Sequence, residues 1–123
     1  MNVAVIGAST QRAKFGNKAV RAYAAAGHTV FPVNPGATEI EGIATCASVR
    51  DIPVPLDVIL VYLPPERTLS VLDDIAAAGA PAVYFNPGSE SPEVVAAARA
   101  RGIDPILACS IVAIGDTPAN YSD

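Results

Sequence analysis

The stretch GASTQRAKFGN, residues 7–17, places hydroxyl and cationic side chains directly after a short apolar run. Ser9, Thr10, Arg12 and Lys14 can all donate hydrogen bonds, and helical patterning begins just after them. The first turn of a helix carries unpaired N–H groups and a partial positive charge, which favour anions. Basic residues there oppose the helix dipole, and a pyrophosphate would relieve that conflict. Arg12 and Lys14 are explained equally well as solvated loop charges, so this loop alone leaves both interpretations open.

The end of the second apolar run lacks an acidic residue. A nicotinamide or flavin dinucleotide site usually has a carboxylate there, which accepts hydrogen bonds from ribose hydroxyls. Here Asn34 follows the run, and the first acidic residue after it is Glu39. The first loop also departs from G-x-G-x-x-G, because after Gly7 the next glycine is Gly16. Both features count against a hydride-transfer enzyme. They suit a ligand with a phosphorylated adenosine ribose, such as coenzyme A or NADP.

No catalytic constellation accompanies these loops. Nucleophilic catalysis requires Ser or Cys beside a base, and Ser9, Ser89, Ser110 and Cys109 have no histidine near them in the predicted site. The single histidine, His28, precedes the second predicted strand and is expected away from that edge. One histidine and two distant cysteines do not make a metal cluster. We therefore expect a binding protein without catalytic residues and without a metal.

The elements that position these loops alternate along the chain. Five apolar segments are predicted strands: 2–6, 28–33, 56–63, 81–86 and 104–109. Helical patterning with Gly or Pro punctuation covers 16–26, 66–79 and 91–102, and a single turn is expected at 48–52. In the first helix the spacing predicts a buried face of Ala19, Val20, Tyr23 and Ala24. Alternating strands and helices predict an α/β, Rossmann-like three-layer fold with a parallel sheet of about five strands.

Right-handed crossovers place the carboxyl ends of all parallel strands at one edge of the sheet. Ligands of such sheets bind in the crevice outside that edge, where the strand order reverses. The candidate site is therefore built from the five loops that leave this edge: 7–17, 34–36, 63–66, 86–91 and 109–111.

Composition limits the function classes. The 123 residues suit one domain, 1–123, and they are 51% hydrophobic with a net charge of −4. That charge disfavours a nucleic-acid partner, and no apolar run approaches the roughly 20 residues of a membrane span. No basic stretch precedes the first strand, so we expect no signal peptide and a cytoplasmic location with reduced Cys46 and Cys109. Dimerisation stays open, because the segment 113–123 is weakly patterned.

Taken in order, the loops resemble a known family. The set GAS…R.KFGN, VNP, PP, NPGSESPE and ACSIV is similar to the coenzyme A-binding domain proteins. These are small stand-alone bacterial proteins that resemble the N-terminal domain of the succinyl-CoA synthetase alpha subunit. The resemblance covers nearly the whole chain, from Val3 to about Ile114, and rests on the ordered series of loops.

The resemblance implies a Rossmann-like fold with coenzyme A, or an acyl-CoA, across the carboxyl edge of the sheet. By position it assigns the phosphates to Gly7, Ala8, Ser9, Arg12 and Lys14, the adenosine part to Val33, Asn34 and Pro35, the adenine or pantetheine to Leu63, Pro64 and Pro65, and the pantetheine end to Asn86, Pro87, Gly88, Cys109 and Ser110.

The chain departs from the synthetase pattern after the second strand. The synthetase domain has a glycine- and lysine-rich segment there, whereas the ionisable residues of NPGATEIEG are Glu39 and Glu41, so recognition of a 3′-phosphate is expected to fall to Arg12 and Lys14. A mixed disulfide between Cys109 and the coenzyme thiol is a further hypothesis. Two alternatives remain: an NAD(P)-dependent oxidoreductase, and a regulatory subunit that senses acyl-CoA while another chain acts.

Overall fold

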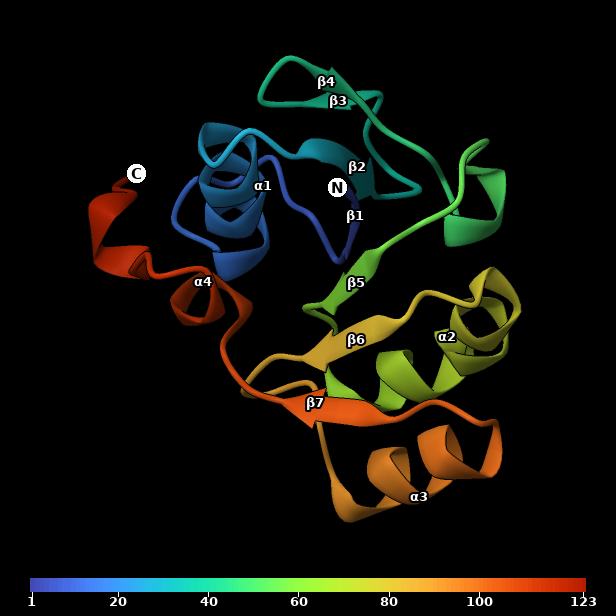
Figure 1. Cartoon of the computed structure of the whole chain (residues 1–123). Coiled ribbons are helices and arrows are strands. Elements are labelled where there is room, and N and C mark those ends of the chain that lie inside the picture. The colour runs from blue at the N-terminus through green and yellow to red at the C-terminus, as the bar shows by residue number, and fades with distance from the viewer.

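A five-stranded parallel sheet in the order β2-β1-β5-β6-β7 forms the framework in the computed structural model, which describes residues 1–123 (Figure 1). Its strands are β1 Asn2–Ile6, β2 Thr29–Val33, β5 Val58–Val61, β6 Ala82–Phe85 and β7 Pro105–Leu107. The chain leaves β1 for β2 on one side and then crosses to β5 on the other. The strand order therefore reverses at β1 and β5, where α/β sheets open a crevice.

Helices cover both faces of the sheet, as the alternating pattern predicts. They are α1 Phe15–Ala25, α2 Pro65–Ala78, α3 Pro92–Ala100 and α4 Ser110–Ala113, with 3-10 turns η1 Val49–Asp51 and η2 Pro118–Asn120. Figure 1 shows α1 and α4 on one side and α2 and α3 on the other. The α/β, Rossmann-like three-layer fold is thus confirmed. None of these helices combines the length and apolar character that crossing a bilayer requires.

The strand residues alternate between two cores. Ala4, Ile59 and Val61 belong to the core beneath α2 and α3, which contribute Leu72 and Val94. On the other face Val3, Val5 and Leu60 pack with Val20 and Tyr23 of α1. Central parallel strands are buried on both faces and therefore have continuous apolar sequences, as the segment 56–63 around β5 does.

Three details differ from the sequence prediction. A small hairpin, β3 Glu39–Ile40 and β4 Ile43–Ala44, lies in a segment interpreted as loop, and α4 follows directly after the predicted fifth strand. In α1 the buried residues include Gly16, Asn17 and Ala22, whereas Ala24 is exposed because it lies at the C-terminal end of the helix, where residues 24–27 are all exposed.

The C-terminal segment folds back onto α1 of its own chain. The backbone carbonyl of Ser122 accepts a hydrogen bond from Arg21 Nη1 at 2.9 Å. The same guanidinium lies over the ring of Tyr121, 5.6 Å from its centroid. The segment whose packing the sequence left open therefore closes one side of α1 (Figure 1).

Ser91 is the N-cap of α3, as its position before Pro92 predicts, and its side chain accepts a hydrogen bond from the N–H of Val94. Replacing Ser91 by Ala should lower the free energy of unfolding by about 1 kcal/mol, because that N–H loses its partner. Urea denaturation checks this. Ser70→Ala, on an exposed position within α2, is the control and should be neutral or slightly stabilising, since Ala is the better helix former. Equal losses in both variants would contradict the capping role.

Candidate functional site

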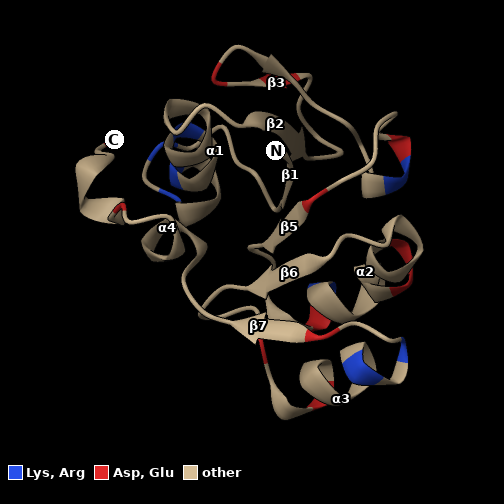
Figure 2. Ribbon diagram, in the orientation of Figure 1, with Lys and Arg blue, Asp and Glu red and all other residues tan.

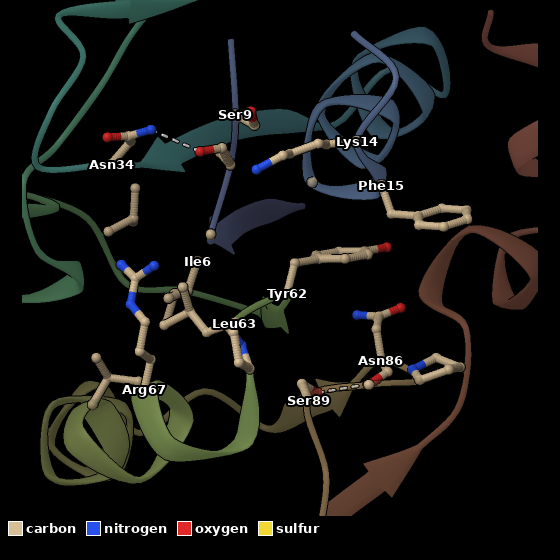
Figure 3. Close-up of a pocket in the computed structure, with 18 of the residues that line it drawn as sticks. Ile6, Ser9, Lys14, Phe15, Asn34, Tyr62, Leu63, Arg67, Asn86 and Ser89 are labelled. Carbon is tan, nitrogen blue, oxygen red and sulfur yellow. Dashed lines mark hydrogen bonds between the residues drawn. The ribbon is translucent and has the colours of Figure 1, made fainter. Parts of the chain in front are cut away.

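A cavity of about 1030 Å³ opens at the carboxyl edge of the sheet (Figure 3). Loops after β1, β2, β5, β6 and β7, the start of α1 and one face of α2 form its walls. The lining residues are Ile6, Gly7, Ala8, Ser9, Ala13, Lys14, Phe15, Gly16, Val33, Asn34, Pro35, Ala47, Tyr62, Leu63, Pro64, Arg67, Val71, Asn86, Pro87, Gly88, Ser89 and Cys109. Its volume lies at the upper end of the roughly 300–1,000 Å³ typical of small-molecule sites.

Two glycines allow the loop after β1 to pack tightly against its neighbours. A Cβ on Gly7, whose φ is +88°, would lie 2.9 Å from the backbone of Tyr62. A Cβ on Gly16 would lie 2.2 Å from the carbonyl oxygen of Gly7. The start of α1 therefore sits directly against the end of β1. Although the sequence lacks G-x-G-x-x-G, Gly16 serves the close helix-to-strand packing that the last glycine of that motif provides.

The N-terminus of α1 faces the cavity without a protein cap. Lys14 occupies the N-cap position with extended backbone, makes no capping hydrogen bond, and no acidic residue lies in the first turn. The Lys14 side chain lines the cavity and forms no ion pair within the protein. A helix end with free N–H groups and an added cation attracts anions.

Asn34 joins the first two loops of the site. Its Nδ2 donates to the carbonyl of Ala8 at 2.9 Å (Figure 3). Its Oδ1 accepts from the N–H of Gly36 at 2.7 Å. Both ends of the amide are therefore engaged within the protein. Dinucleotide enzymes use a carboxylate at this position to bind ribose. In this protein the Asn34 side chain instead connects two backbone segments.

A second buried amide organises the other side of the cavity. Asn86 donates to the carbonyl of Val61 at 3.1 Å, and its Oδ1 accepts from both the N–H and the hydroxyl of Ser110, at 2.8 and 3.0 Å. Because the Ser110 hydroxyl donates there, the phenol of Tyr62 is the donor in its 2.8 Å hydrogen bond to Ser110 Oγ. The hydroxyl of Ser89 donates to the carbonyl of Asn86 at 2.7 Å.

The two tyrosines of this network stay protonated at neutral pH. Burial raises the pKa of Tyr23, whose hydroxyl donates to the carbonyl of Ser110 at 2.6 Å, to about 12. Burial likewise raises the pKa of Tyr62 far above its ordinary value, and the hydrogen bond to Ser110 opposes this shift only in part. Tyr62 therefore contributes an uncharged surface to the cavity.

Arg67 is a lining cation that the sequence analysis did not single out. It lies in the first turns of α2 and points into the cavity (Figure 3). Pro64, Arg67 and Val71 line the same wall because residues three and four apart share a helix face. The same spacing, applied to the helix predicted after the strand 56–63, would have indicated that Arg67 lies on the face that carries Pro64. Like Lys14, Arg67 has no carboxylate partner.

The charge of the lining is opposite to that of the whole protein. The chain carries a net charge of −4, yet the lining contains two cations and no Asp or Glu. In Figure 2 the loop before α1 and α1 itself carry Lys and Arg and no acidic residue. Nor does any group of His, Cys, Asp and Glu suitable for a metal ion occur in the molecule. The two lining cations therefore favour an anionic ligand.

All candidate residues from the sequence line this cavity except Arg12, Pro65 and Ser110. The guanidinium of Arg12 faces Glu41 at 3.5 Å instead, at the turn of the β3–β4 hairpin. Pro65 begins α2 and lies off the face that carries Pro64 and Arg67. Ser110 is fully buried behind the cavity wall, where it holds Asn86 and Tyr62.

His28 lies at the opposite edge of the sheet, as expected. Its ring is 3.3 Å from the N-terminal nitrogen of Met1 and packs against Tyr23. It is therefore remote from every candidate nucleophile that lines the cavity. The backbone of Cys46 forms an isolated parallel bridge with Val33, at the end of the edge strand β2.

Comparison with known proteins identifies the family and supports the fold. Residues 1–115 match the family described as "CoA binding domain". The uncharacterized protein YneT of Bacillus subtilis (strain 168) is 25% identical over 100 residues, which are 81% of this chain and 74% of YneT. A conserved hypothetical protein from Pyrococcus furiosus is 35% identical, with a TM-score of 0.83 over 91% of this chain and 97% of its own.

A larger enzyme contains a similar unit. The acetyl-coenzyme A synthetase 1 of Ca. Korarchaeum cryptofilum, solved with phosphate and ADP, is 29% identical with a TM-score of 0.76, covering 88% of this chain but 25% of the synthetase chain. The match to the family extends over nearly the whole sequence, from the first strand through α4. The chain therefore belongs to the CoA binding domain family.

Proposed function

We propose that this protein binds coenzyme A or an acyl-CoA in the cavity at the carboxyl edge of the sheet. The phosphates lie against Lys14, Arg67 and the N–H groups at the start of α1. The remainder of the coenzyme follows the mostly apolar lining between the two helices. In this arrangement the phosphates contact the two cations and the backbone N–H groups that have no partner within the protein.

The pairing of Lys14 and Arg67 in a cavity without carboxylates carries the proposal. Three ion pairs neutralise other arginines of this protein, yet neither lining cation belongs to one. Charged groups near an apolar cavity are stabilised when they meet opposite charges and hydrogen-bond partners. A coenzyme with three phosphate groups supplies both, and the family supports this choice.

We further propose that the chain performs no chemistry of its own on this ligand. Ser9 and Ser89 line the cavity, but Ser9 Oγ accepts from Gln11 N and the Ser89 hydroxyl donates to a backbone carbonyl. No histidine or carboxylate among the lining residues can act as their base. In the matched acetyl-coenzyme A synthetase 1 the similar unit is a quarter of the chain. This agrees with a binding unit that other domains or chains complement.

An NAD(P)-dependent oxidoreductase is the weaker alternative. The adenosine ribose of NAD would need an acceptor after β2, where the Asn34 amide is already engaged at both ends. The phosphorylated ribose of NADP would need a cation there instead. Of the two nearest acids, Glu41 pairs with Arg12 and Glu39 lies exposed in the hairpin. Neither lines the cavity.

Thermal unfolding with added nucleotides tests the proposal. A ligand that binds only the folded state stabilises it by RT ln(1 + [L]/Kd), roughly 2.7 kcal/mol at a hundredfold excess over Kd. For a domain of this size that corresponds to a rise in Tm on the order of 10 °C. We expect this rise with coenzyme A, a smaller one with 3′-dephospho-coenzyme A, and little with NAD or NADP at the same concentration. A rise with the dinucleotides alone would contradict the proposal.

A further inference from the structure

The cavity has one charged end and one uncharged end. In Figure 3 Arg67 and Asn34 lie on one side, while Phe15 and Asn86 lie on the other. The ammonium of Lys14 points toward the side of Asn34, although its helix begins near Phe15. Both lining cations thus serve the same part of the cavity.

Polar side chains at the uncharged end are engaged in hydrogen bonds within the protein. The hydroxyls of Tyr62 and Ser89 donate to Ser110 Oγ and to the Asn86 carbonyl. The amide nitrogen of Asn86 donates to the carbonyl of Val61. Cys109, next to Ser110, and the ring of Phe15 complete this end without adding a charge.

An acidic residue lies beside the uncharged end. The N–H of Gly88, a residue that lines the cavity, points to Glu90 Oε1 at 3.4 Å, so a carboxylate already engages this backbone donor. Glu90 is half-buried and has no ion-pair partner. Its negative charge therefore repels an anionic group that enters this part of the cavity.

We infer that this end receives the thiol or an uncharged acyl group, and that the protein discriminates against acyl-CoA thioesters whose acyl group ends in a carboxylate. The inference rests on the proposed function, because phosphates held at Lys14 and Arg67 direct the thiol arm to the opposite end. A terminal carboxylate there loses water, finds no cation, and meets the charge of Glu90. An ion that is desolvated without a partner binds poorly.

Isothermal titration with butyryl-CoA and succinyl-CoA tests this inference, because the two acyl chains have the same four carbons and differ in the terminal carboxylate. Succinyl-CoA should bind at least about tenfold more weakly, the change expected when a charged group loses its hydrogen bonds on burial. Unmodified coenzyme A, titrated in parallel, reports on the proposed function independently.

Glu90→Gln isolates the contribution of the acidic residue. The amide keeps an acceptor for the N–H of Gly88 but removes the charge, so the ratio of the two affinities should fall about two- to fivefold, as for a partly exposed charge pair. Glu93→Gln, an exposed change in the first turn of α3, alters the net charge equally and should leave the ratio unchanged.

Equal binding of the two thioesters by the native protein would overturn the inference, as would tighter binding of succinyl-CoA. So would a ratio that Glu90→Gln and Glu93→Gln change alike. If coenzyme A itself does not bind, the proposed function fails. If coenzyme A binds and the two thioesters are not distinguished, only the further inference fails.

Discussion

Replacing Lys14 and Arg67 together by Ala is expected to weaken coenzyme A binding by a factor of about one hundred or more. A hydrogen bond to a charged group contributes about 1.5–3 kcal/mol, and each variant residue removes at least one such contact with phosphate. The double variant should lose more affinity than either single variant, because the N-cap of α1 and the helix α2 present the two side chains from different walls of the cavity. Isothermal titration at fixed ionic strength measures the effect.

The same double variant should keep its stability. Lys14 caps α1 without a hydrogen bond and opposes the helix dipole, while Arg67 is exposed and unpaired. Its Tm should therefore be unchanged or slightly higher in the absence of ligand. Loss of affinity together with an intact fold would separate a binding defect from unfolding.

A control with the same net charge distinguishes local contacts from the overall field. Arg50→Ala with Arg99→Ala also removes two positive charges, but both residues lie outside the cavity. This control should bind coenzyme A nearly as tightly as the native protein. If it loses as much affinity as the cavity variant, the phosphates are not bound by Lys14 and Arg67.

Much of the site location follows from the sequence because parallel α/β topology is strongly encoded. The apolar run 56–63 and the helix signals around it define the central strand and its loop, and hence the edge where ligands bind. Asn34 shows how a single residue carries information: an amide at the position of the usual acid predicts a different ligand. The structure adds that this amide also fixes the first loop.

The parts that sequence reasoning did not find depend on short or tertiary features. Strands β3 and β4 have two residues each, too few to show a period of two, so the pairing of Glu41 with Arg12 could not be anticipated. Glu41 also has φ of +51°, a conformation that sequence patterns rarely indicate for Glu. Arg67 resembles any exposed helix charge until the packing of α2 beside the cavity is known.

The substitution Gly16→Ala should destabilise the fold by about 1–3 kcal/mol, in the opposite direction to the usual effect of Ala in a helix. Gly16 has ordinary helical backbone, so Ala would normally stabilise α1 by roughly 0.5–1 kcal/mol. The added Cβ, however, lies 2.2 Å from the carbonyl oxygen of Gly7, which is part of the backbone and cannot rotate away. The start of α1 must shift outward, and urea denaturation should report the loss.

Gly36→Ala is the matched control for this clash. Its added Cβ meets only the side chain of Asn34, at 3.4 Å, and its φ does not require glycine, so the substitution should be neutral or mildly stabilising. Because the shift of α1 moves its N-terminus and Lys14 together, Gly16→Ala should also weaken coenzyme A binding even where the protein stays folded. Full stability with Ala at residue 16 would mean that helix and strand do not meet this closely, and the anion site built on that contact would lose its geometric basis.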